Sequence, residues 1–244
     1  MMSDQYAPTI LLTRDGDALE RFRQTLETYA APHINILTFS PLYTYNCDIP
    51  PLSSTDFDKI IVSSERALPW LKSNLDNLSG VKILCVGTHL AKQITACGYF
   101  CAQTYPQMEF LLKDEAMYVG AKILYVRGLH IRHDLKEMIA TKASHYEEVT
   151  VYEARERETL PADIQEAIRS GKIRYISVFS ARAGETLVRL IRTSRLEDAC
   201  TRIQCLCLSP VVLKSVGSLN WHQTYAASTA DMDGMAKLAA DVLE

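Results

Sequence analysis

A serine followed two residues later by an arginine closes an apolar, β-branched run at two places in the chain. The first copy holds Ser64 and Arg66, and the second holds Ser180 and Arg182. An amphipathic stretch at helical spacing follows each copy, which predicts a strand, a tight turn and a helix that starts at the turn. A serine there caps the helix, and the first free backbone N–H groups point outward beside it. Each turn is therefore a candidate anion site, and two such turns facing one another would hold a large polyanion.

The two serine turns belong to a longer repeat. Residues Ile60–Leu71 read IIVSSERALPWL, and residues Ile176–Leu187 read ISVFSARAGETL. A further strand and helix follow each copy, and Gly98 at the end of that helix matches Asn220 in the second copy. Glycine and asparagine both tolerate a left-handed helix end, so we expect one at each position. The repeat predicts two homologous lobes.

Other polar residues stand where predicted strands end. Arg14 follows a short apolar strand, and Arg127-Gly128 follow a buried one. Ligands of open parallel sheets bind outside the carboxyl ends of the strands. An arginine at such a place can hold a carboxylate through two parallel hydrogen bonds. The plainer interpretation, in which the serines cap helices and the arginines are solvated, stays open at this stage.

The sequence shows no cofactor or metal motif. The turn Val86-Gly87-Thr88 is not GxGxxG and lacks the acidic residue that a ribose contact needs, so we expect no nicotinamide cofactor. His130 and His133 lie three residues apart, but no third ligand is evident, and we interpret them as solvated or capping histidines. Tyr152 lies in an alternating strand, where an aromatic residue is ordinary.

Composition limits the class of protein. The chain has 244 residues, of which 48% are hydrophobic, and its net charge is −3, so neither nucleic acid nor an acidic membrane surface is an expected partner. Seven cysteines lack zinc-site spacing, and we expect reduced thiols. The first residues do not have the pattern of a signal peptide, and no apolar stretch is long enough to span a bilayer. We therefore expect a soluble, cytoplasmic protein.

Strand and helix patterns alternate along the chain, which predicts an α/β fold with parallel sheets flanked by helices. The segment 44–56 is rich in Pro, Ser and Asp and is predicted to be a loop. The expected strands are 9–13, 34–39, 59–63, 81–86, 122–126, 147–154, 174–179, 202–208 and 224–227. The expected helices are 19–30, 66–75, 90–97, 106–117, 134–141, 161–170, 182–192, 211–217 and 231–243.

The chain resembles the uroporphyrinogen III synthase family over almost its whole length and in the same order. The matching segments are ILLTR at Ile10–Arg14, VSSERAL at Val62–Leu68, CVG at Cys85–Gly87, LYVRG at Leu124–Gly128, TVYEA at Thr150–Ala154 and VFSARAG at Val178–Gly184.

The resemblance implies two similar lobes, each a flavodoxin- or Rossmann-like parallel sheet flanked by helices, joined by a two-stranded linker. One lobe is discontinuous and comprises residues 1–38 and 155–244, and the other comprises residues 41–149. The linkers are expected near residues 39–43 and 149–154.

The resemblance also implies a reaction. The family closes the linear tetrapyrrole hydroxymethylbilane into uroporphyrinogen III, inverting the last pyrrole ring and releasing water, without a metal or organic cofactor. It suggests a monomer that receives its substrate from hydroxymethylbilane synthase. The family's tyrosine acid falls on Tyr152. The expected substrate-binding residues are Arg14, Ser63, Ser64, Arg66, Gly87, Thr88, Arg127, Gly128, Ser180, Ala181, Arg182 and Ser209.

The chain departs from the family in its second lobe. Many members have Gly-Pro-Thr-Thr where this chain has Ser209-Pro210-Val211-Val212, and Leu90 stands where a threonine is frequent. Two alternatives therefore stay open. One is a non-catalytic bilobed module that binds a tetrapyrrole or another polyanion. The other is an unrelated two-lobed transferase, against which the absence of a nucleotide motif counts.

Overall fold

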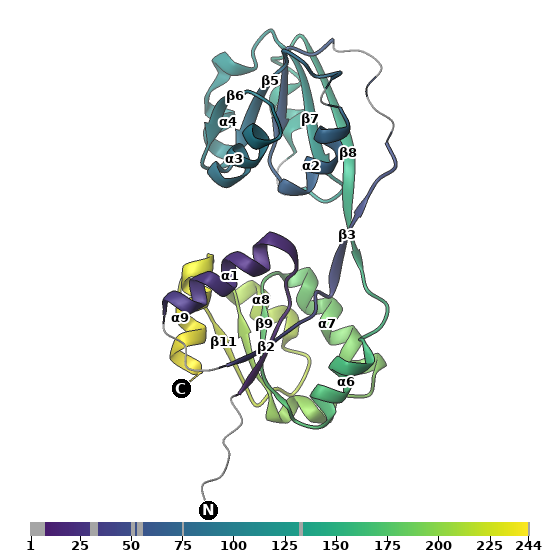
Figure 1. Cartoon of the computed structure of the whole chain (residues 1–244), viewed down its shortest axis with the longest axis vertical. Helices are drawn as coiled ribbons and strands as arrows, with labels where there is room; N and C mark the ends of the chain where they lie inside the picture. The colour runs from purple at the N-terminus through teal and green to yellow at the C-terminus, as the bar shows by residue number, and fades with distance from the viewer. Residues whose placement is uncertain are drawn as a thin grey trace, which may run out of the picture. The chain divides into compact units, whose positions relative to one another are not determined.

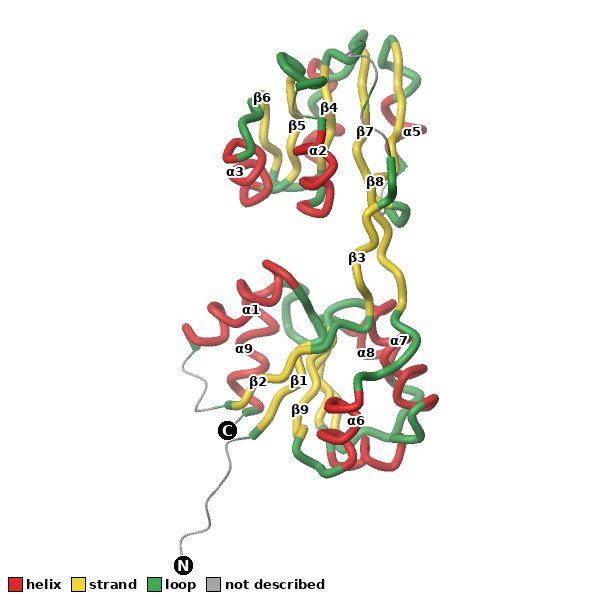
Figure 2. Tube along the Cα trace, turned by 45° about the vertical axis from the view of Figure 1, so that its right-hand side comes forward, coloured by secondary structure: helices red, strands yellow, loops and turns green. Residues whose placement is uncertain are grey.

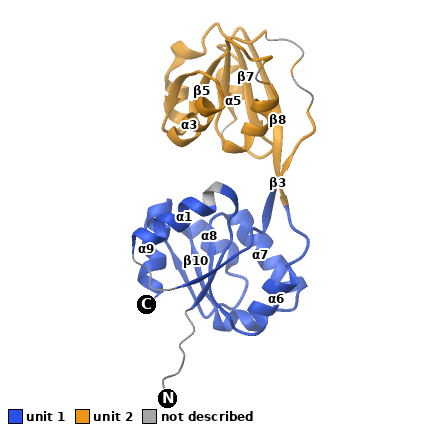
Figure 3. Ribbon diagram, in the orientation of Figure 1, with its two compact units in different colours: residues 1–43, 156–244 blue, residues 44–155 orange. Residues whose placement is uncertain are grey.

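Two compact units make up the protein, as a computed structural model shows (Figure 3). The structure describes residues 8–29, 34–49, 52, 56–74, 76–131 and 134–243. Unit 1 comprises Met1–Tyr43 and Glu156–Glu244, and unit 2 comprises Thr44–Arg155. Both chain crossings lie within strands, because β3 (Leu42–Asn46) and β8 (His145–Glu156) each span a boundary between the units.

Unit 1 is built on a parallel sheet in the order β11-β10-β9-β1-β2 (Figure 1). Numbered along the chain within the unit, this order is 2-1-3-4-5, the doubly wound arrangement, and it reverses direction between β1 and β9. The strands are β1 (Thr9–Leu12), β2 (Asn35–Thr38), β9 (Ile173–Val178), β10 (Gln204–Cys207) and β11 (Gln223–Ala226). The helices are α1 (Gly16–Thr28), α6 (Ala162–Arg169), α7 (Ala181–Thr193), α8 (Pro210–Val216) and α9 (Met232–Val242), with a 3₁₀ segment at Glu197–Arg202.

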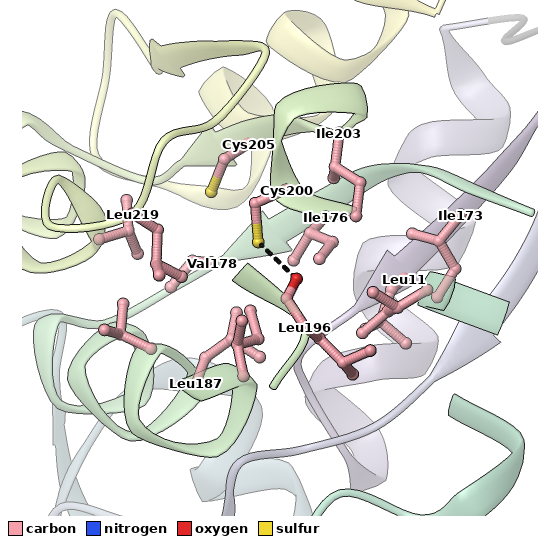
Figure 4. Close-up of a cluster of buried hydrophobic side chains, with 14 of the residues drawn as sticks. Leu11, Ile173, Ile176, Val178, Leu187, Leu196, Cys200, Ile203, Cys205 and Leu219 are labelled. Carbon is pink, nitrogen blue, oxygen red and sulfur yellow. Dashed lines mark hydrogen bonds between the residues drawn. The ribbon is translucent and has the colours of Figure 1, made fainter. Parts of the chain in front are cut away.

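Both faces of the unit 1 sheet are buried, because side chains alternate between them along each strand. Leu11 and Ile176 point to the face covered by α6, α7 and α8, whose core Figure 4 shows. Ile10 and Leu12 point to the opposite face, where α1 and α9 lie side by side (Figures 1 and 2). Continuous apolar runs such as Thr9–Leu12 follow from this double burial.

Unit 2 is built on a sheet in the order β3-β8-β7-β4-β5-β6, in which β4 to β8 are parallel. The order reverses between β4 and β7. The strands are β4 (Lys59–Val62), β5 (Lys82–Val86), β6 (Cys101–Tyr105) and β7 (Lys122–Gly128), together with β3 and β8. The helices are α2 (Leu68–Ser73), α3 (Thr88–Ala96), α4 (Met108–Lys113) and α5 (Leu135–Ile139), with 3₁₀ segments at Glu65–Ala67 and Glu115–Met117.

The two units share one architecture with a permuted chain. Strands β4-β5-β6-β7-β8 of unit 2 take the places of β9-β10-β11-β1-β2 in unit 1. The register of pairing is also the same in the two units. Relative to the serine that ends each copy of the repeat, β7 lies opposite β4 at the same positions at which β1 lies opposite β9. Arg127 at the end of β7 is therefore the structural counterpart of Arg14 after β1. The sequence repeat covers only the part of each unit that is not permuted.

The predicted α/β fold of two similar lobes with parallel sheets is confirmed, and individual elements differ. Strand β6 was not expected, because CAQTY is a half-exposed edge strand with little apolar pattern. The predicted loop 44–56 contains the end of β3, which pairs with β8. The left-handed end is present at Gly98 but not at Asn220, because α8 ends earlier, at Gly217 in the right-handed region.

The seven cysteines are free thiols. Burial raises the pKa of Cys85 to about 12, and burial with the nearby Glu197 carboxylate raises that of Cys200 to about 12. Cys47 and Cys97 are partly exposed. No helix in the described part of the chain has the length and apolar character needed to cross a membrane.

We predict that iodoacetamide at pH 8 labels native Cys47 and Cys97 at least about tenfold faster than Cys85 and Cys200. A thiol reacts as its thiolate, and a raised pKa keeps Cys85 and Cys200 neutral at this pH. Peptide mass spectrometry at timed quenching measures each site. Denatured protein is the control, because all seven thiols should then react alike. Equally fast labelling of Cys85 in the native protein would contradict the prediction.

Candidate functional site

A pocket of about 680 Å³ opens at the carboxyl ends of the strands of unit 2. It lies where the strand order reverses between β4 and β7, the place at which ligands bind in open α/β sheets. Its lining comes from the ends of all five parallel strands. The lining residues are Ser63, Ser64, Arg66, Val86, Pro106, Gln107, Met108, Glu109, Tyr125, Gly128, His130, Ile131 and Tyr152.

The pocket brings together five residues that the sequence singled out. Ser63, Ser64 and Arg66 follow β4, Gly128 ends β7, and Tyr152 lies on β8. Sixty residues or more separate the first group from the others in the chain. Parallel pairing places these strand ends at one edge of the sheet, so their side chains can act on one ligand.

A β-bulge aims Tyr152 at the pocket. Strand β8 pairs Thr150 with Arg127 but Tyr152 with Gly128, which leaves Val151 as the extra residue. Val151 is buried in the core beneath α2 and α3, and Tyr152 packs against the same cluster. Regular alternation would send two consecutive side chains to opposite faces. The bulge interrupts this alternation and so turns the Tyr152 phenol toward the pocket.

Gly128 makes room for the ring that the bulge delivers. A Cβ atom on Gly128 would lie 2.5 Å from two ring carbons of Tyr152 and 2.9 Å from its hydroxyl oxygen. Such a contact is far inside van der Waals distance. The backbone N–H of Leu129 also donates to the Tyr152 carbonyl at 2.9 Å. Glycine is therefore required here for space, and the contact fixes where the phenol sits.

Tyr125 is a second phenol in the pocket, and the sequence analysis did not single it out. The residue is 4% exposed, and its hydroxyl oxygen lies 3.2 Å from the Ser63 hydroxyl oxygen. Burial is the main cause that raises the pKa of Tyr125. The only sequence signal was its place three residues before Gly128 in LYVRG. His130, interpreted from the sequence as solvated or capping, also lines the pocket.

Arg127 is held by other groups of unit 2 and is not among the residues that line the pocket. Its Nε donates to Glu148 at 2.7 Å, and its Nη1 donates to the Gly128 carbonyl at 3.0 Å. The other carboxylate oxygen of Glu148 accepts the Tyr146 hydroxyl at 2.7 Å. Burial first, and then this carboxylate, raise the pKa of Tyr146. The half-buried Arg127–Glu148 pair thus ties β7 to β8 beside the pocket.

Gly87 and Thr88 also lie outside the pocket lining. Gly87 has a φ of 107°, which a residue with a side chain rarely adopts, and it precedes α3 directly. Its N–H donates to the Tyr105 carbonyl at 2.8 Å, so the turn closes the end of β5 against β6. Thr88 is the first residue of α3.

The corresponding place in unit 1 is filled by the unit's own side chains. The Arg14 guanidinium lies 4.5 Å above the centre of the Phe179 ring, and its Nη1 contacts the Met232 sulfur. Phe22 meets Phe179 edge to face with ring centres 5.0 Å apart. Phe179 is the repeat partner of Ser63. Aromatic and cationic side chains thus occupy the switch point of unit 1.

The remaining predicted residues of unit 1 cap helices or form ion pairs. Ser180 accepts from the Ala183 N–H at 3.2 Å, and Ser209 accepts from the Val212 N–H at 3.4 Å. Arg182 lies 3.4 Å from the Glu156 carboxylate. Ala181 is the first residue of α7.

No group of three or more His, Cys, Asp or Glu residues that could hold a metal ion occurs among the residues that the structure describes. His133 lies outside those residues, so the pair with His130 is not described. The Arg66 guanidinium and the hydroxyl groups of the pocket can bind an anionic organic ligand. The lining also includes the Glu109 carboxylate, the His130 imidazole and the Gln107 amide.

Comparison with known proteins decides the family. The model of a family described as uroporphyrinogen-III synthase HemD matches residues 24–237. The chain belongs to the uroporphyrinogen-III synthase family. It is a cyclising lyase that converts hydroxymethylbilane to uroporphyrinogen III in haem biosynthesis. The match spans both units, as expected from the resemblance of the motifs.

The fold of the chain is shared with a solved structure. The uroporphyrinogen-III synthetase of Helicobacter pylori is similar with a TM-score of 0.64 at 13% identity, covering 96% of this chain and 99% of that one. A mutant uroporphyrinogen III synthase from Thermus thermophilus gives a TM-score of 0.47 at 14% identity, covering 98% of this chain and 100% of that one. No curated protein matches the chain.

We predict that Gly128→Ala lowers the rate of uroporphyrinogen III formation at least about tenfold, because the new methyl group must displace the Tyr152 ring. Initial rates with hydroxymethylbilane measure the effect. Gly217→Ala is the matched control, since its nearest neighbour would be 3.5 Å away and its φ is −67°. A Gly128→Ala enzyme of normal rate would show that the ring position does not matter.

Proposed function

We propose that the unit 2 pocket binds carboxylates of hydroxymethylbilane and that Tyr152 is the acid that protonates its departing hydroxyl group. The observation that carries the proposal is the meeting of Tyr152 with Ser63 and Arg66 in one pocket at the switch point. The substrate supplies matching chemistry, because it is a linear tetrapyrrole with eight carboxylates. A pocket of this volume can enclose part of such a molecule.

Each proposed role follows from the group involved. A phenol is protonated at neutral pH and can give its proton to the hydroxyl as the C–O bond breaks, so that the hydroxyl leaves as water. The exposed Arg66 guanidinium can hold a carboxylate with two parallel hydrogen bonds. Hydroxymethylbilane also closes without enzyme, to the uninverted isomer. Catalysis therefore needs one fixed geometry of substrate and acid, and the contact of Gly128 with Tyr152 supports that requirement.

The other residues of the predicted set are proposed contacts for further carboxylates. They are Arg14, Gly87, Thr88, Arg127, Ser180, Ala181, Arg182 and Ser209. For the arginines, binding requires that a carboxylate of the substrate compete with present partners, such as Glu148 for Arg127 and Glu156 for Arg182. Val211 stands where many family members have a threonine, and it is 69% exposed at the start of α8.

We also propose that the enzyme acts as a cytoplasmic monomer and takes its substrate directly from hydroxymethylbilane synthase. The spontaneous closure of the substrate supports direct transfer, since a short transit leaves less time for the wrong isomer to form.

Tyr152→Phe should lower kcat for uroporphyrinogen III formation by about 10²-fold or more, because a positioned acid contributes about 10²–10⁴-fold. The variant keeps the ring that packs against Gly128, so its thermal stability should stay near that of the parent. The measurement is the isomer ratio of the oxidised products from fresh hydroxymethylbilane. Most of the product of Tyr152→Phe should be the type I isomer, formed at the rate of the enzyme-free reaction. Full type III formation by Tyr152→Phe would disprove the proposed acid, and type I alone from the parent protein would favour the binding-module alternative.

Arg66→Ala should raise the KM for hydroxymethylbilane roughly fivefold, since an exposed ion pair is worth up to about 1 kcal/mol. The difference from the parent should shrink as salt is added. Lys92→Ala removes the same charge from an exposed position of α3 that does not line the pocket, and it is the control. Equal KM values for Arg66→Ala and Lys92→Ala would argue against a carboxylate contact at Arg66.

A further inference from the structure

Tyr125, whose hydroxyl group pairs with that of Ser63, lies in the pocket but has no role in the proposal above. Tyr125 is on β7 and Ser63 follows β4, the two strands that flank the switch point. Their hydroxyl oxygens are 3.2 Å apart. Both residues contribute to the pocket lining although the Tyr125 ring is almost wholly buried. Tyr125 therefore lines the pocket with only a small part of its surface exposed.

The direction of this hydrogen bond follows from the acidity of the two groups. A phenol is a much stronger acid than an aliphatic alcohol, so the Tyr125 O–H is the better donor and the Ser63 oxygen the better acceptor. Burial keeps the Tyr125 phenol protonated by raising its pKa. Ser63 lowers the pKa because it can donate to the phenol once this is ionised, Tyr152 and Glu148 raise it, and Arg127 lowers it. With Tyr125 as donor, Ser63 keeps its own hydrogen to give to a ligand.

The fold does not require a hydroxyl pair at this place. In unit 1 the positions that correspond to Tyr125 and Ser63 are Leu12 and Phe179, which are both buried and apolar. The same strand pairing occurs there with two apolar side chains in place of the hydroxyl pair. The hydroxyl pair thus belongs to unit 2, where a pocket opens at the switch point.

We propose that Tyr125 is a positioning residue that donates to Ser63 Oγ and so directs the Ser63 hydroxyl hydrogen toward a carboxylate of the bound tetrapyrrole. This inference rests on the proposed function, in which the unit 2 pocket binds the substrate carboxylates. Tyr125 itself acts through Ser63 and touches no reacting atom. Its contribution appears in substrate binding and not in proton transfer, which separates it from Tyr152.

Steady-state kinetics of a double-mutant cycle test this role. The proteins are the full chain, Tyr125→Phe, Ser63→Ala and the double variant, each assayed for uroporphyrinogen III formation over a range of hydroxymethylbilane concentrations. Each single variant should raise KM roughly fivefold and change kcat less than about twofold. The double variant should show no larger effect than Ser63→Ala alone, because Tyr125 acts only through that hydroxyl.

Two controls separate positioning from structure. Tyr118→Phe removes a buried phenol of unit 2 that donates to the Leu112 carbonyl at 2.8 Å and does not line the pocket, and its KM should stay unchanged. Ser63→Thr keeps a hydroxyl group, so its KM should stay near the parent value, unlike that of Ser63→Ala. Thermal unfolding of every variant checks that the fold is intact.

The outcomes also separate this inference from the proposed function. If Ser63→Ala raises KM and Tyr125→Phe does not, the positioning role fails and the pocket remains the binding site. If the KM effects of the two substitutions multiply in the double variant, Tyr125 does not act through Ser63, and the positioning role likewise fails. If neither Ser63→Ala nor Arg66→Ala changes KM, the pocket is not where the substrate binds, and both proposals fall.

Discussion

Parallel strand pairing is the constraint on which both units depend. Parallel strands must be joined by crossovers, so every parallel strand in a unit delivers its carboxyl end to the same edge of the sheet. Where the order of strands reverses, the helices that follow two neighbouring strands leave toward opposite faces. This reversal lies between β1 and β9 in unit 1 and between β4 and β7 in unit 2. The polar residues identified from the sequence lie around these two places.

The two units use the same architecture differently. In unit 1, Arg14, Phe179, Phe22 and Met232 fill the switch point with stacked and edge-on contacts. In unit 2 the same place is a pocket with two phenols and two serines in its lining. A single exchange accounts for part of the difference, because Phe179 and Ser63 are repeat partners with very different volumes. This difference is the reason that we propose unit 2 as the place of carboxylate binding and proton donation.

Tyr152, the proton donor that we propose, is positioned by backbone geometry. The bulge at Val151 turns Tyr152 toward the pocket, and the bare backbone of Gly128 sets how closely the ring can approach. The Arg127–Glu148–Tyr146 network joins the same two strands next to the bulge. Rigid support of this kind suits a reaction in which the competing uncatalysed closure gives the wrong isomer, since selectivity then depends on geometry.

The sequence alone determined the alternation of strands and helices, the two serine turns, the family and five of the pocket residues. These features are local, because an apolar run, a capping serine and helical spacing each depend on neighbours in the chain. Only the tertiary structure decided which serine turn faces an open pocket, that Arg127 binds Glu148, and that Tyr125 meets Ser63. Those facts depend on strand order, register and a bulge, which join residues as far apart as the 62 positions between Ser63 and Tyr125. No local pattern encodes such pairings, because the same apolar strand sequence is compatible with several partners and registers.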